Sequence, residues 1–172
     1  TEKKNKIETL GTGATQTAHQ SGAVRVQGVE VGVSGNVTPK LSLAGGAVLM
    51  DTKVTSSVVP DAVGKDLANV AEKSASIQAK YQATPKVAVG GTVVHTGKIK
   101  GGTFAATTGL ELPSSNRLDL MGEYKINNKL STQLNIKNAT DETIYEAFYR
   151  STAPFTYVAP GRTTNISLTY DF

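Results

Sequence analysis

The sequence predicts an all-β fold, an antiparallel up-and-down meander of about eight long strands. Three observations lead to this prediction. Apolar residues recur at every second position over long segments, which is the period of a strand, and helical spacing never persists. The connections between these segments alternate between short and long. The segment that begins at Val37 is repeated from Ala83, so one hairpin plus one long connection forms a repeating unit.

The alternating pattern marks the strands one by one along the chain. It covers 24–33, 41–49, 75–81, 87–93, 117–126, 130–137 and 165–172. In the first of these segments the valines change parity at Gly28, from Val24 and Val26 to Val29 and Val33. That change predicts either a glycine bulge or a strand that leaves its apolar environment.

The order of the connections indicates a membrane environment. Short turns are predicted at 36–40, 83–86 and 127–129, and long connections at 14–23, 53–72, 98–115 and 141–161. A transmembrane β-barrel has short turns at one end and long loops at the other, whereas a soluble sandwich mixes loop lengths at both ends. The pattern therefore favours part of a transmembrane barrel. A soluble binding sandwich that buries the apolar face in a core is the alternative.

In a barrel, one face of each strand contacts lipid and the other lines the lumen. The residues expected to face lipid are Leu118, Leu120, Tyr124, Leu134, Ile136, Ile166 and Leu168. Those expected to face the lumen are Asp119, Glu123, Asn135, Ser167 and Thr169. Tyr81, Tyr124 and Tyr170 lie near strand ends, where outer-membrane barrels carry an aromatic girdle.

Composition narrows the possible functions. The chain has 172 residues, a formal charge of +4 and basic residues scattered mostly singly, which argues against a nucleic-acid partner. It has no cysteine, and its two histidines, His19 and His95, have no partner at ligand spacing, so no metal site is expected. The sequence contains no combination of Ser, His and an acidic residue that is typical of a hydrolase site. We therefore do not expect an enzyme. The first residues, from Thr1, have no apolar signal core and suggest the interior of a longer chain.

Several short segments follow one another in a defined order along the chain. They are Arg25-Val-Gln-Gly-Val-Glu-Val31, Gly64-Lys-Asp-Leu-Ala-Asn-Val70, Leu134-Asn-Ile-Lys-Asn-Ala-Thr-Asp141, Pro160-Gly-Arg162 and Tyr170-Asp-Phe172. Together they resemble the TonB-dependent outer-membrane receptors, and specifically the catecholate-type ferric siderophore receptors. Ala71 stands where that family usually has a proline after the second segment.

The resemblance implies a barrel of about 22 strands with a plugged lumen, of which residues 1–172 would be the C-terminal part. It implies import of a ferric siderophore across the outer membrane of a Gram-negative bacterium. The siderophore is then the transported ligand and not a cofactor. The other implied partners are TonB, acting through a plug absent from this chain, the outer-membrane lipids and the barrel-assembly machinery. The alternative is a self-contained eight-stranded outer-membrane barrel with an adhesive, structural or enzymatic role.

Two groups of residues are candidates for function. The last long connection contains half of the ten aromatic residues, around one arginine: Tyr145, Phe148, Tyr149, Arg150, Phe155 and Tyr157. They form either an aromatic girdle with ordinary loop packing, or a surface that stacks catechol rings while arginine offsets the negative charge of a ferric complex. Tyr170 and Phe172 resemble the terminal aromatic signal read by the assembly machinery. Otherwise they are further lipid-facing aromatics.

Overall fold

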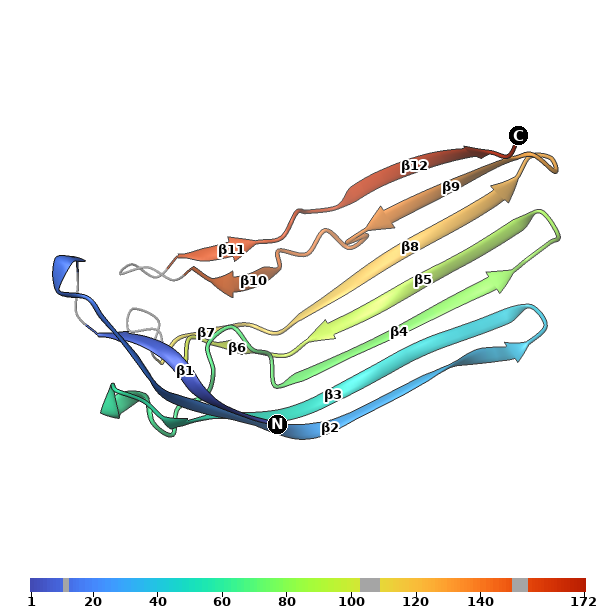
Figure 1. Cartoon of the computed structure of the whole chain (residues 1–172). Helices are drawn as coiled ribbons and strands as arrows, with labels where there is room; N and C mark the ends of the chain where they lie inside the picture. The colour runs from blue at the N-terminus through green and yellow to red at the C-terminus, as the bar shows by residue number, and fades with distance from the viewer. Residues whose placement is uncertain (11–12, 103–108, 150–154) are drawn as a thin grey trace.

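The computed structural model describes residues 1–10, 13–102, 109–149 and 155–172. Eight strands form one antiparallel sheet in which each strand lies beside its neighbours in the chain (Figure 1). They are β1 (Glu2–Leu10), β2 (Thr17–Thr38), β3 (Leu41–Ser56), β4 (Lys73–Gln82), β5 (Val87–Thr96), β8 (Ser115–Lys125), β9 (Leu130–Lys137) and β12 (Thr163–Tyr170). The predicted meander is confirmed.

The remaining elements are short and lie in the connections. Two small hairpins pair β6 (Ile99–Lys100) with β7 (Glu111–Leu112) and β10 (Tyr145–Phe148) with β11 (Thr156–Val158). Single 3-10 turns are formed by Gly13–Thr15 and Pro60–Ala62. Among the described residues, no helix is long and apolar enough to cross a membrane.

The three short turns are closed by the same pattern of side-chain-to-backbone hydrogen bonds. Thr38 Oγ1 accepts from the backbone N–H groups two and three residues later, at 3.2 and 3.0 Å. Thr84 Oγ1 does the same at 3.2 and 3.0 Å, and Asn127 Oδ1 at 2.9 and 3.0 Å. Asn and Thr side chains commonly close turns in this way. The internal repeat in the sequence is therefore a repeat of one turn structure.

One face of the sheet is a continuous apolar band. Because directly paired residues share a face, the pairing register carries this band across the strands through Val33, Gly45, Ile77, Val93 and Leu118. Closer to the short turns it passes from Val89 through Gly122 and Leu134 to Ile166. All seven residues expected to face lipid belong to this band, which also holds Tyr81, Tyr124 and Tyr170 at the end with the short turns.

The opposite face is polar, and its charges form pairs. Lys80 Nζ donates to both oxygens of Glu123 at 2.8 and 2.7 Å, across β5. Arg117 forms an ion pair with Asp119 at 3.1 Å. Asn135, Ser167 and Thr169 belong to the same face, as expected. The division into an apolar and a polar face is that of a barrel wall between lipid and lumen.

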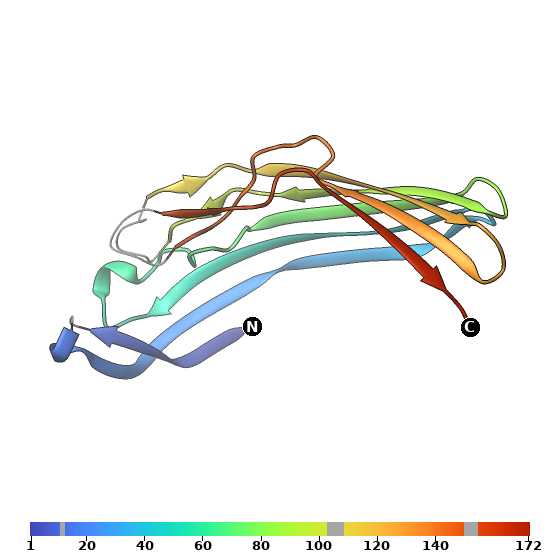
Figure 2. The same ribbon diagram turned by 90° about the horizontal axis from the view of Figure 1, so that it is seen from above.

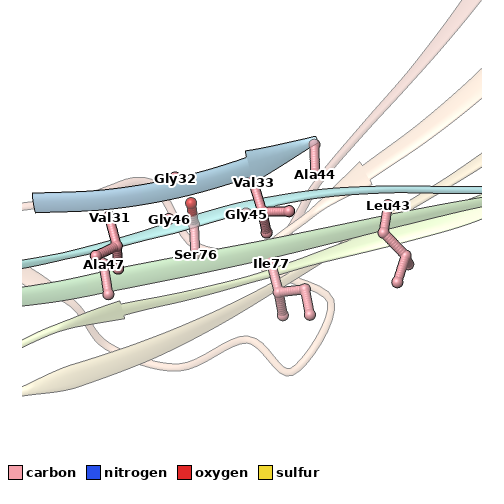
Figure 3. Close-up of a pocket in the computed structure, with 10 residues that line it drawn as sticks. All are labelled: Val31, Gly32, Val33, Leu43, Ala44, Gly45, Gly46, Ala47, Ser76 and Ile77. Atoms are coloured by element: carbon pink, nitrogen blue, oxygen red, sulfur yellow. The ribbon is translucent and has the colours of Figure 1, made fainter. Parts of the chain in front are cut away.

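Glycines leave a shallow hollow in the apolar band. Gly32, Gly45 and Gly46 line it, and the side chains of Val31 and Ile77 project beside it from the same side of the sheet (Figure 3). Its volume is about 290 Å³. The hollow offers almost no polar group, so we do not assign an anionic ligand to it.

The outer ends of β2 and β3 correct two details of the predictions. β2 has 22 residues and β3 has 16, more than the about 9–11 residues that span a bilayer, so both project beyond the apolar band. Much of the predicted connection 14–23 is therefore strand. No bulge occurs at Gly28, where the register is continuous. Instead the strand passes out of the apolar band, as the second interpretation predicted. Val24 is buried, whereas Val29 and Val33 are exposed within the band.

The sheet is curved and open. Figure 2 shows an arched wall of strands, with β1 and β12 at its two edges. A self-contained barrel requires its first and last strands to pair, and these two strands do not. A soluble sandwich requires a second layer over the apolar face, and in the described part of the chain Val31, Val33, Ile77 and Ile166 remain exposed. Both alternatives are therefore inconsistent with this structure.

Candidate ligand-binding end of the sheet

The long connections gather at the end of the sheet opposite the short turns (Figures 1 and 2). The β6–β7 hairpin lies in the connection after β5, and the β10–β11 hairpin in the connection after β9. These two hairpins and the connection 57–72 meet through a small hydrophobic cluster of Ile99, Leu112 and Phe148, with Ala71 packed against it. Ala71 also forms a backbone bridge with Ile99. Three separate connections thus share one core outside the predicted lipid zone.

Asn69 connects the same three segments by hydrogen bonds. Its side-chain Oδ1 accepts from the Phe148 N–H at 2.7 Å, and its Nδ2 donates to the Phe148 carbonyl at 2.9 Å. Its own backbone N–H donates to the Lys100 carbonyl at 3.1 Å. Asn69 has a φ of 61°, in the left-handed region that asparagine tolerates better than most residues.

A group of charges holds the connection 57–72 against β3 and β6. Asp66 accepts from Lys100 Nζ at 2.6 Å and also from Lys53 Nζ. Lys100 reaches Glu72 at 3.1 Å as well. The hydrogen bond from Lys100, and then that from Lys53, lowers the pKa of Asp66, while the bond to Asp66 raises the pKa of Lys100. Asp51 lies near Asp66 and Glu72, but lysines already compensate this acidic group, and we assign no metal to it.

The pairing of Asp66 predicts a pH dependence. Because its folded-state pKa lies below the ordinary value of 3.8, its pairing stabilises the connection above that value and is lost as the pH falls through the lowered pKa. A spin label at the exposed Val63 should become severalfold more mobile as the pH falls from about 6 to well below 3.8. Asp66→Asn should already be mobile at the higher pH. The matched variant Asp61→Asn should keep the transition, and an unchanged transition in Asp66→Asn would refute this role.

The connection between β9 and β12 is shaped by its own polar residues. Asn138 is fully buried, with a φ of 50°, and its side chain forms hydrogen bonds with both the N–H and the carbonyl of Glu142 at 3.1 and 2.9 Å. The Asn138 N–H donates to Asp119. Asp141 accepts from the Arg162 N–H at 2.7 Å, which anchors the chain where it enters β12. These bonds give a structural reason for the Asn138–Asp141 and Pro160–Arg162 segments.

The structure separates the aromatic residues predicted to bind ligand. Phe148 is 6% exposed and belongs to the hydrophobic cluster, so its observed role is packing. Tyr149, Phe155 and Tyr157 are 49%, 61% and 53% exposed. The rings of Tyr149 and Tyr157 meet edge to face, with centroids 5.7 Å apart. Tyr145 is at the root of the same hairpin, and Arg150 lies outside the described residues.

The two histidines lie apart from this hairpin. His95 Nδ1 is 2.8 Å from Asn116 Oδ1, and His19 Nε2 is 3.1 Å from Thr17 Oγ1. Neither belongs to a group of possible metal ligands within the described ranges. In the sequence, Asn69 is distinguished only as one residue of the segment 64–70. Its two bonds to Phe148 join residues 79 positions apart, and local patterns do not reveal such a contact.

The fold and this end of the sheet define a class of protein: a wall segment of an outer-membrane-type barrel with structured hairpins beyond the lipid zone. Residues 1–139 match the family described as TonB dependent receptor-like, beta-barrel. The chain belongs to this family.

Similar proteins agree with this assignment. The probable TonB-dependent receptor BfrD of Bordetella pertussis is 32% identical over 86% of this chain and 20% of its own length. The catecholate siderophore receptor Fiu of Escherichia coli is 29% identical over 82% of this chain and 18% of its own length. The crystal structure of the siderophore receptor PiuA from Acinetobacter baumannii superposes with a TM-score of 0.83, at 25% identity, over 98% of this chain and 24% of that one. This chain thus spans about a fifth of the length of these curated relatives.

Proposed function

We propose that this chain is the C-terminal part of the barrel of an outer-membrane receptor that imports ferric siderophores of the catecholate type. Family membership supports a TonB-dependent receptor, and the names of Fiu and PiuA support a siderophore as the ligand. Energy would come from TonB through a plug outside these residues. The location would be the outer membrane of a Gram-negative bacterium, with the assembly machinery as a further partner. Its role would be transport and not catalysis.

The observation that carries the ligand class is the exposed aromatic surface of the β10–β11 hairpin. Tyr149 and Tyr157 are held edge to face, and Phe155 exposes its ring beside them in the chain. A ferric tris-catecholate complex is anionic and presents flat rings, which aromatic side chains can stack against. Arg150 adjoins Tyr149 in sequence and would supply a positive charge at any physiological pH.

Removing the two paired tyrosines tests this site. In the receptor that contains this chain, Tyr149→Ala combined with Tyr157→Ala should weaken binding of ferric tris(2,3-dihydroxybenzoate) by about 1–3 kcal/mol, since each ring contact contributes about 0.5–1.5 kcal/mol. Calorimetry on the detergent-solubilised receptor measures this. Tyr124→Ala, at the opposite end of the sheet, is the matched control and should bind normally.

The ligand class needs its own comparison. A ferric trihydroxamate complex has the same metal but no catechol rings, so it should bind more weakly than the catecholate and respond little to the loss of the tyrosines. Equal binding of both complexes would contradict the catecholate assignment while leaving a siderophore receptor. Normal binding and uptake of the catecholate by the double tyrosine variant would move the site away from this hairpin.

A further inference from the structure

We infer that Asn69 is a positioning residue that locks three outer connections into one unit and thereby holds the aromatic hairpin in place. The inference rests on the proposed function where it concerns ligand binding, but the lock itself does not depend on any ligand. The observation behind it is the pair of hydrogen bonds that one side chain makes to both backbone groups of Phe148.

The β10–β11 hairpin needs support from outside itself. β10 has four residues and β11 three, and an isolated two-stranded hairpin is marginally stable in water. β11 pairs with one edge of β10, at Tyr145, Ala147 and Phe148. The Asn69 amide binds the N–H and the carbonyl of Phe148, as the backbone of a third strand would. Asn69 therefore satisfies backbone groups that the hairpin itself does not pair.

The position of these bonds links them to the exposed rings. Phe148 immediately precedes Tyr149, whose N–H donates to the Phe155 carbonyl at 2.9 Å. The Phe148 side chain is fixed at the same time in the cluster with Ile99 and Leu112. The backbone from Phe148 to Tyr149 is thus held on both sides. This fixes the position from which the Tyr149 ring contacts Tyr157.

Asn69 also holds the second hairpin. Its N–H donates to Lys100, and Lys100 donates in turn to Asp66, which precedes Asn69 by three residues. The connection 57–72 and the β6–β7 connection are therefore joined by two separate contacts. The β10–β11 hairpin is attached to both of them through the Asn69 side chain. A change at Asn69 is expected to release the β10–β11 hairpin while β6 remains held by its lysine.

The variant Asn69→Gly tests the role of the side chain without disturbing the backbone conformation. Glycine adopts a φ near 61° without strain, so this variant removes the two bonds to Phe148 and leaves the connection able to keep its path. Hydrogen exchange of the segment 145–149 in the full receptor should become about tenfold faster. Asn127→Gly removes a different hydrogen-bonding asparagine, from a short turn at the opposite end of the sheet, and should leave that exchange unchanged. Unchanged exchange in Asn69→Gly would overturn the lock.

A double-mutant cycle distinguishes positioning from a separate effect on binding. Asn69→Gly alone should weaken the affinity for ferric tris(2,3-dihydroxybenzoate) several-fold. In a receptor that already lacks the Tyr149 and Tyr157 rings, the same substitution should have no further effect. Fully additive losses would overturn the positioning role. Faster exchange in Asn69→Gly, together with normal binding by the double tyrosine variant, would support the lock and overturn the proposed ligand site.

Discussion

Leu134→Lys is expected to destabilise the barrel in lipid by about 2–4 kcal/mol, the cost of a lysine on the lipid-facing side near the bilayer midplane. Leu134 lies within the apolar band, where it pairs with Gly122 on one side and Ile166 on the other. A lysine there would have no water, and no carboxylate lies on the same face of the paired strands to form an ion pair with it. The loss of stability can be measured by urea unfolding of the receptor in lipid vesicles, with resistance to protease as the readout of the folded fraction.

The adjacent residue provides the control for this substitution. Gln133 belongs to the opposite face and pairs with Glu123 across to β8. A lysine at position 133 would lie among polar groups and near a carboxylate, so Gln133→Lys should change the stability by much less. Equal destabilisation by the two substitutions would show that the two faces are not divided between lipid and lumen.

The main sheet was predictable because its signal is local and repeated. Alternation fixes which residues share a face, and a residue such as Leu120 keeps its place whether its partner strand is known or not. The length of the strands beyond the apolar band was less predictable. β2 begins at Thr17, in a segment without apolar alternation, because pairing with β1 and β3 maintains it beyond the lipid zone.

The proposed ligand-binding end was predictable only as a concentration of aromatic residues. Composition cannot distinguish Phe148, which packs against Ile99 and Leu112, from Tyr149, which points to the surface one residue later. The small hairpins have strands of two to four residues, too short for a periodic signal. Asn69 acts through a contact between residues far apart in the chain, and its role became visible only with the fold.

Deletion of Phe172 should reduce insertion of the receptor into the outer membrane severalfold while leaving the inserted barrel nearly as stable as before. The ring of Phe172 is fully exposed, and its observed contact is edge to face with Tyr170 at 5.2 Å between centroids. Losing such a pair costs about 0.5–1.5 kcal/mol, which is too little to prevent folding. A large loss of insertion would therefore reflect recognition by the assembly machinery.

Two measurements on the same strain separate recognition from stability. The amount of receptor in the outer-membrane fraction reports insertion, and urea unfolding of the purified receptor reports stability. Phe172→Tyr keeps an aromatic ring at this position and should insert normally, whereas Phe172→Ala should behave like the deletion. If the deletion lowers insertion and stability in proportion, or lowers neither, Phe172 is one more lipid-facing ring. In that case the information for assembly lies elsewhere in the strands. The first place to test is β12, which among the described strands pairs with β9 on one side only.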